Sequence, residues 1–211
     1  QIIAKYPEAF TTALTAADVR AAFKAGKVGS MIGLEGGHAI ENSLGALRAY
    51  YAMGARYMTL THNVTLDWAD AALDSAKHNG FTPFGREVVR EMNRLGMLVD
   101  LSHVSPAVMS NALDIAEAPV IFSHSGARAL VDHPRNVPDS ILRRLPKNGG
   151  VVMVPFVPGC VSPMQRKHSL SRGHVASDMR QRYAADTAGF GREMKAWDAA
   201  NPAPRATLND V

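Results

Sequence analysis

The chain has 211 residues, of which 46% are hydrophobic, so it is long enough to bury one sizeable core. Its formal net charge is +4, but the 23 Lys and Arg residues are scattered among 19 acidic residues, so we expect no nucleic-acid partner. No apolar stretch reaches the roughly 18 residues of a membrane span, and the single cysteine, Cys160, excludes an internal disulfide. These features leave the cellular location open.

The first part of the chain, residues 1–26, is rich in Ala and is predicted to be helical, with Thr15 as an N-cap. Apolar runs then alternate with helical stretches. Strands are predicted at 29–35, 56–62, 97–103, 119–123 and 150–156, and helices at 43–53, 83–95, 106–117 and 138–146.

Several helix ends carry clear local signals. Thr82-Pro83 and Ser105-Pro106 each combine an N-cap residue with a proline suited to the first helical position. Gly54 and Gly96 stand where a helix that ends needs a residue in the left-handed conformation.

The alternation of strands with helices predicts an α/β fold with a parallel sheet, because parallel neighbours need crossover connections. The strand interiors are continuously apolar, as expected for strands covered on both faces. This favours a (β/α)8 TIM-type barrel, of which this chain covers about five strands. A doubly wound open sheet is the alternative, but Gly36-Gly37 lacks the third glycine of a phosphate-binding turn.

We expect residues 1–161 to form the partial barrel that carries the catalytic site, and residues 162–211 to form a polar excursion. A helix is predicted near 178–199, packed on the barrel exterior; a lid or a dimer contact is the alternative. Its apolar residues at helical spacing are Tyr183, Phe190, Met194 and Trp197. The chain starts without Met, and Thr207 opens a helix-start capping box near its end. We therefore expect a piece of a longer polypeptide.

Four polar residues, Glu35, His62, His103 and His124, lie at or near the carboxyl ends of four predicted strands. Each lies an even number of positions from apolar residues of its strand, and residues at such positions lie on one face of a strand. We therefore expect all four side chains to face the same interior of the sheet or barrel. In a parallel barrel that interior opens at the carboxyl-terminal rim. A single histidine there is also compatible with a hydrogen-bonded rim residue. The repeated placement favours a metal site, and imidazole and carboxylate suit Zn²⁺.

Five motifs in a fixed order make the pattern specific. They are Gly33-Leu-Glu-Gly-Gly-His38, Leu60-Thr-His-Asn63 with Trp68-Ala-Asp70, Val99-Asp-Leu-Ser-His-Val-Ser105, Ser123-His-Ser125 and Arg135-Asn-Val-Pro-Asp139. From about residue 28 to 160 the chain thereby resembles the renal, or membrane, dipeptidase family of zinc hydrolases.

The resemblance implies an amidohydrolase-type TIM barrel that holds two zinc ions and hydrolyses dipeptides with a metal-activated water. Glu35 matches the carboxylate that bridges the two ions, and His103 and His124 match ligands of one zinc. His62 matches the histidine that faces the scissile group, and Arg135 matches the arginine that receives the substrate carboxylate. The resemblance also favours a homodimer.

The chain departs from the family pattern in two places. A His-x-Asp pair on the first barrel strand and an aspartate on a late strand do not occur in the 211 residues. We expect these groups, and with them the remaining ligands of the second zinc, outside this chain. Two alternatives stay open: another amidohydrolase that acts on N-acyl amino acids, or a non-catalytic zinc-binding relative.

Three further residues have structural interpretations. Asp100 has the opposite parity to His103, so it is expected to point toward the helix layer and to act as a structural hydrogen-bond acceptor. His38, after the double glycine, is expected to support its loop. For Asp70, in the loop after His62, substrate contact and loop ordering are equally compatible with the sequence.

Overall fold

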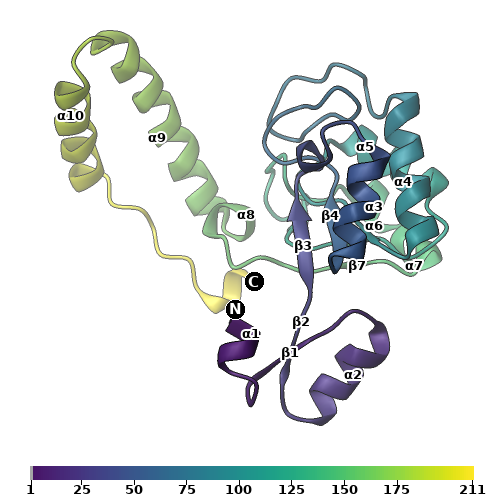
Figure 1. Ribbon diagram of the computed structural model, residues 1–211. Helices are drawn as coiled ribbons and strands as arrows, with labels where there is room; N and C mark the ends of the chain where they lie inside the picture. Colours follow the sequence, from purple (N-terminus) through teal and green to yellow (C-terminus); the bar gives the residue numbers. More distant parts are fainter. Residues whose placement is uncertain (1) are drawn as a thin grey trace. The chain divides into compact units, whose positions relative to one another are not determined.

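The computed structural model describes residues 2–211 (Figure 1). These residues divide into two compact units. The first unit contains the chain up to Ser123 together with residues Ser140–Val152. The second contains His124–Asp139 and Met153–Val211. The expected division into a partial barrel over residues 1–161 and a polar excursion over residues 162–211 stays a prediction.

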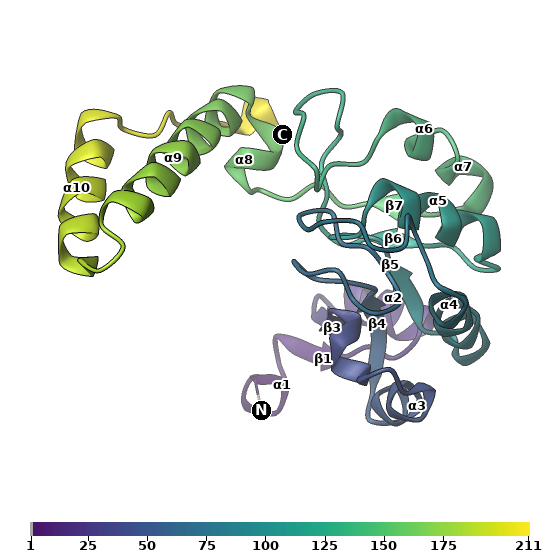
Figure 2. The same ribbon diagram turned by 90° about the horizontal axis from the view of Figure 1, so that it is seen from above.

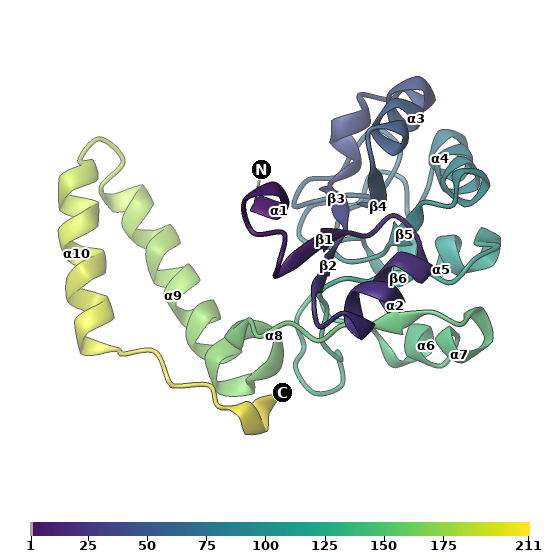
Figure 3. The ribbon, with the colours of Figure 1, turned by 60° about the horizontal axis from the view of Figure 1, so that its bottom comes forward.

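The amino-terminal segment of the first unit is only partly helical (Figure 3). Its elements are α1 (Ile2–Lys5), β1 (Phe10–Thr12), α2 (Ala16–Lys24) and β2 (Val28–Ser30). Among the described residues 2–26, the expected helical structure is found only in α1 and α2, because Pro7 disfavours helix at the residue before it and β1 pairs in parallel with β2. The N-cap at Thr15 is confirmed, and Asp18 completes a capping box.

The first unit is built on a five-stranded parallel sheet, which confirms the expected α/β fold. Its strands follow chain order: β3 (Ile32–Glu35), β4 (Ala55–Thr59), β5 (Leu98–Asp100), β6 (Ile121–Phe122) and β7 (Val151–Val152). The single strand expected at 29–35 is divided at Met31, because β2 pairs with β1 while β3 pairs with β4. The remaining strands end earlier than expected, and the residues beyond them form the loops that carry the candidate site.

Helices α3, α4 and α5 connect these strands and lie on one side of the sheet (Figure 2). The helical segments of this region are η1 (Gly37–Ile40), α3 (Leu44–Ala52), α4 (Pro83–Leu95), α5 (Pro106–Ile115), α6 (Asp139–Leu142) and α7 (Leu145–Asn148). The expected caps are confirmed: the Thr82 and Ser105 side chains accept backbone hydrogen bonds at the starts of α4 and α5, and Gly96 ends α4 with φ 79°.

The register of the sheet corrects the expected orientation of one acidic residue, Asp100. Glu35 pairs with Thr59, and Thr59 pairs with Asp100, so all three side chains project from one face of the sheet. Met58 and Val99 belong to the opposite face and are 0% and 2% exposed in the core. Asp100 therefore shares the face of Glu35, and its expected orientation toward the helices is wrong.

The second unit is mainly helical. Its helices after residue 152 are α8 (Pro158–Val161), α9 (Pro163–Arg182), α10 (Thr187–Ala200) and η2 (Leu208–Asp210). The single helix expected near 178–199 is wrong, because the Asp186 side chain accepts a hydrogen bond from Gly189 N at 2.7 Å and starts a separate helix, α10. The helices α9 and α10 lie side by side (Figure 1) and are joined by an Arg172–Asp198 ion pair. Across residues 2–211, no helix combines the length and apolar character that crossing a membrane requires.

Candidate metal centre

Glu35 and His103 form the centre of the candidate site in the first unit. Glu35 is the last residue of β3, and its Oε1 lies 3.1 Å from Nε2 of His103. His103 is only 4% exposed, whereas the Glu35 side chain is 55% exposed. Two ligands at about 2.1 Å from a tetrahedral zinc ion lie roughly 3.4 Å apart. The observed separation therefore suits two ligands of one ion.

An unusual backbone conformation directs His103 toward Glu35. His103 lies three residues beyond β5 and has φ 68°, in the left-handed region that non-glycine residues seldom adopt. Its carbonyl accepts hydrogen bonds from Ala72 N at 2.7 Å and from Thr61 Oγ1 at 3.2 Å. At this turn the side chains no longer alternate between the two faces of the sheet. The direction expected for His103 from strand alternation therefore does not apply.

His62 lies beside the same pair. It follows β4 by three residues, and its ring centroid is 4.5 Å from that of His103, with 53° between the ring planes. The first unit thus brings Glu35, His62 and His103 together. Gly36, with φ 121°, permits the close approach, because a Cβ there would lie 3.2 Å from Cβ of His62 and against the ring of His38.

His124 and Arg135 lie close together in the second unit. His124 follows Ser123 and therefore comes just after β6 in the chain. Arg135 Nη2 donates a hydrogen bond to the carbonyl of His124 at 3.2 Å. Among residues 2–211, the candidate set of metal ligands consists of Glu35 and His103 in the first unit and His124 in the second. Its carboxylate and two imidazoles form a donor set that suits zinc.

The surroundings of Arg135 are positively charged. His133 Nδ1 accepts a hydrogen bond from Arg135 N at 3.0 Å. Burial, together with the charges of Arg166, Arg135 and Arg128, lowers the pKa of His133 from 6.5 to about 4. His133 is therefore neutral near pH 7, and the cluster of guanidinium groups favours an anionic ligand.

The loop after His62 is ordered by Asp70. Asp70 is 0% exposed, and its carboxylate accepts hydrogen bonds from the backbone amides of Lys77, His78 and Gly80. Burial raises the pKa of Asp70, but these hydrogen bonds outweigh it and the net shift is downward. Of the two alternatives left open by the sequence, the structure favours loop ordering. The same loop contains Ala72, whose backbone amide donates a hydrogen bond to the carbonyl of His103.

Tyr57 is a neighbour of the site that no local sequence pattern reveals. Tyr57 pairs with Gly33 across β3 and β4, and its ring fills the space that a side chain at Gly33 would occupy. Burial raises the pKa of Tyr57, and the charges of Asp100 and Glu35 add to this effect. The sequence signal for this contact is a glycine that pairs with a large residue on the neighbouring strand. Such a pair can be recognised only when the strand register is known.

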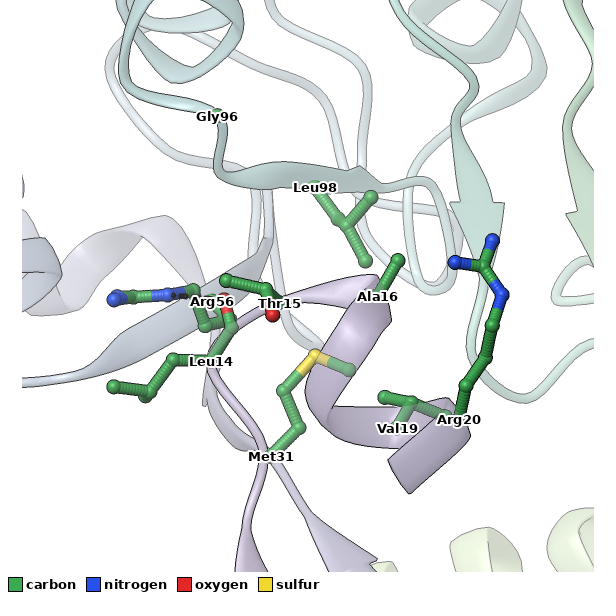
Figure 4. Close-up of a pocket in the computed structure, with 9 residues that line it drawn as sticks. All are labelled: Leu14, Thr15, Ala16, Val19, Arg20, Met31, Arg56, Gly96 and Leu98. Carbon is green, nitrogen blue, oxygen red and sulfur yellow. Dashed lines mark hydrogen bonds between the residues drawn. The ribbon is translucent and has the colours of Figure 1, made fainter. Parts of the chain in front are cut away.

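A separate pocket of about 400 Å³ lies at the amino ends of the strands (Figure 4). Its lining consists of Leu14, Thr15, Ala16, Val19, Arg20, Met31, Arg56, Gly96 and Leu98. None of these residues is a His, Cys, Asp or Glu, and the guanidinium of Arg56 is hydrogen-bonded to the carbonyls of Leu14, Tyr51 and Ala55. The pocket therefore offers none of the side chains that commonly bind a metal ion.

The whole chain, residues 1–211, matches the family model described as membrane dipeptidase (peptidase family M19). It is 49% identical over 159 residues to an uncharacterized dipeptidase of Schizosaccharomyces pombe, and 48% identical over 159 residues to the dipeptidase tcpJ of Claviceps purpurea. Each alignment covers 75% of this chain, but only 39% and 37% of the two relatives. The matched segment thus spans less than two fifths of their length.

Solved structures show a similar fold. The probable dipeptidase PvdM from Pseudomonas aeruginosa superposes with a TM-score of 0.81 at 24% identity, over 99% of this chain and 58% of that protein. A metallo peptidase from Rhodobacter sphaeroides, liganded with a phosphinate mimic of the dipeptide L-Ala-D-Ala, gives a TM-score of 0.65 at 28% identity, over 73% of this chain and 45% of that protein. These similarities confirm the expected TIM-type α/β architecture.

Proposed function

The chain belongs to the membrane dipeptidase family, and we propose that the full-length protein is a zinc-dependent dipeptidase. It hydrolyses the peptide bond of dipeptides. The curated relatives are named as dipeptidases, and the Rhodobacter sphaeroides peptidase binds a dipeptide mimic. The observation that carries the proposal is the 3.1 Å approach of Glu35 and His103 at the carboxyl ends of the sheet.

In this proposal Glu35, His103 and His124 hold one zinc ion. Glu35 also bridges to a second zinc, because a carboxylate has two oxygens and the Glu35 side chain is 55% exposed. The remaining ligands of the second ion come from the part of the full-length protein that this chain does not include. When bound, zinc supplies Lewis-acid activation of water and lowers its pKa toward neutrality.

His62 would act on the substrate. Its ring lies beside His103, with 4.5 Å between the centroids, which puts an N–H donor next to a metal ligand. We assign to it a hydrogen bond to the scissile carbonyl oxygen, which becomes stronger as negative charge develops on that oxygen.

Arg135 would bind the carboxylate at the carboxyl terminus of the dipeptide. A guanidinium offers two parallel N–H donors that match a carboxylate, and the neighbouring Arg166 and Arg128 add positive charge. The hydrogen bond from Arg135 to the carbonyl of His124 keeps this clamp beside a proposed metal ligand. Such proximity limits substrates to very short peptides. The homodimer that the family resemblance favours stays a prediction.

Metal analysis of the full-length protein, combined with hydrolysis assays, tests the proposal. We expect about two zinc ions per chain, hydrolysis of dipeptides, loss of activity after chelation and recovery after zinc is restored. Activity on N-acyl amino acids alone would favour the other amidohydrolase. One zinc or none, without hydrolysis of either substrate class, would favour the non-catalytic relative.

A further inference from the structure

Asp100 is a fully buried carboxylate that connects three strand ends. It is 0% exposed and is the last residue of β5. Its Oδ2 accepts hydrogen bonds from Thr59 Oγ1 at 2.7 Å and from Ser123 Oγ at 2.5 Å. Its Oδ1 accepts from Ser102 N and Ser123 N, both at 3.0 Å. One side chain thereby joins the carboxyl ends of β4, β5 and β6.

This arrangement uses the full acceptor capacity of a carboxylate, which is about four lone-pair sites. Within residues 2–211, no Lys, Arg or His forms an ion pair with Asp100; hydrogen bonds from two hydroxyls and two amides surround it. Burying a carboxylate is costly, and apolar residues that pack well are often at least as stabilising. A role in placing neighbouring groups accounts for a carboxylate at this position.

Two residues that donate hydrogen bonds to Asp100 come directly before the candidate histidine ligands in the sequence. The contact from Ser102 N closes a turn of the Asx type after β5, and His103 follows with φ 68°. On the neighbouring strand, Ser123 is held through both its amide and its hydroxyl, and His124 is the next residue.

Asp100 is also linked to the third candidate ligand. The register places Glu35, Thr59 and Asp100 in one row on the same face of the sheet. Thr59 stands between the two carboxylates and donates its hydroxyl to Asp100. The carboxylate of Asp100 therefore fixes the strand next to Glu35 as well as the two strands that lead to His103 and His124.

We propose that Asp100 is a positioning residue of the metal centre, whose hydrogen bonds fix the directions in which His103 and His124 present their imidazoles. This inference rests on the proposed zinc site, but it concerns metal affinity and geometry, not the substrate. It predicts that the Asp100 network determines how tightly the folded protein binds zinc.

The test uses the full-length protein with Asp100→Ala and Asp100→Asn. The zinc dissociation constant is measured by competition with a chromophoric chelator, and the ligand geometry is followed by the visible spectrum of the Co²⁺-substituted protein. We expect Asp100→Ala to weaken zinc binding about 10- to 100-fold and to change the Co²⁺ spectrum. Asp100→Asn keeps an oxygen acceptor for the two amides and should recover most of the affinity.

Glu91→Gln is the matched control. It removes a carboxylate that is 8% exposed and that pairs with Arg48 and Arg94 in the helix layer. We expect this variant to lose stability while its zinc dissociation constant and Co²⁺ spectrum stay unchanged. An equal loss of affinity in Glu91→Gln and Asp100→Ala would overturn the proposal, because it would show general destabilisation.

Zinc affinity within twofold of wild type in Asp100→Ala, with an unchanged Co²⁺ spectrum, would also overturn it. If Asp100→Ala does not fold, the double variant Thr59→Val with Ser123→Ala replaces it. That variant removes both hydroxyl donors and keeps the carboxylate, and we expect zinc binding at least threefold weaker; unchanged affinity would refute the role. A wild-type protein that binds zinc tightly but hydrolyses no dipeptide would refute the proposed function alone.

Discussion

Nε2 of His103 lies 3.1 Å from Oε1 of Glu35, although 68 residues separate the two in the chain. Strand β4 stands between the strands that carry them, so two strand spacings of about 4.8 Å each separate their backbones. The side chains span this gap because both project from the same side of the sheet, and the left-handed turn at His103 directs its ring back toward Glu35. The pair is therefore a product of tertiary structure.

His103→Ala and His124→Ala should each remove one zinc from the full-length protein and abolish hydrolysis, because each histidine is the sole ligand that its strand contributes. Metal analysis of the purified variants measures the effect. The control is His174→Ala, which replaces an exposed histidine on α9 and should leave the zinc content unchanged. Full zinc content in both ligand variants would end the metal assignment.

Glu35→Gln should be more damaging than either histidine change. An amide carries no charge and cannot bridge two cations as a carboxylate does, so we expect reduced zinc content and loss of turnover. Glu87→Gln, on the exposed side of α4, is the matched control and should behave like wild type. Both zincs in place with near-normal turnover in Glu35→Gln would rule out the bridging role.

The fold was predictable from sequence where local chemistry determines it. Helix α4 has the predicted bounds, 83–95, because Thr82 and Pro83 specify its start and Gly96 specifies its end within the segment itself. The expected number of strands in the sheet is likewise confirmed. Strand ends were predicted less well, since a strand ends where its partner ceases to offer hydrogen bonds, and that depends on distant residues.

The identities of the candidate site residues could be predicted, but their directions could not. Strand alternation placed Glu35 and Asp100 on opposite faces, whereas the register places them on the same face. At His103 the alternation fails, because hydrogen bonds from Ala72 and Thr61 hold its carbonyl in a left-handed turn. Neither donor is near His103 in the sequence, so no local pattern reveals the turn.

The pH dependence of stability should reflect Glu91. The hydrogen bond from Arg94, with a further one from Arg48, lowers the pKa of Glu91 from 4.5 to about 2. Ionised Glu91 therefore makes its full contribution to the free energy of unfolding above about pH 4.5, and this contribution is lost as the pH falls toward 2. Glu91→Gln should lower the free energy of unfolding at pH 7 by about 1 kcal/mol, because both arginines are more than half exposed. Chemical denaturation at several pH values should show the difference vanishing near pH 2.

His133 should remain neutral over most of the acidic range. Its pKa is lowered from 6.5 to about 4 by burial and then by Arg166, Arg135 and Arg128. Its contribution to stability is thus present above about pH 6.5 and is lost as the pH falls to about 4. An NMR titration should give a midpoint near 4, and Arg166→Ala should raise it. A midpoint near 6.5 in the wild type would show that His133 is solvated.

Arg135 offers the most specific test of substrate binding. If its guanidinium pairs with the substrate carboxylate, Arg135→Lys should keep the zinc and the fold but lower kcat/KM by one to two orders of magnitude. The reason is that a charged hydrogen bond contributes roughly 1.5–3 kcal/mol, and an ammonium cannot reproduce the two-donor geometry. A surface arginine with no contact to substrate would give a change near zero.

A dipeptide amide provides the control for this prediction, because it has no terminal carboxylate for Arg135 to bind. The wild-type protein should hydrolyse the amide poorly, and Arg135→Lys should then add little further loss. Arg135 also donates a hydrogen bond to the carbonyl of His124, so a purely structural role predicts a different result: an equal loss on the free dipeptide and on its amide, together with a changed zinc content. That outcome would assign Arg135 to supporting His124, and the carboxylate clamp would have to be another residue.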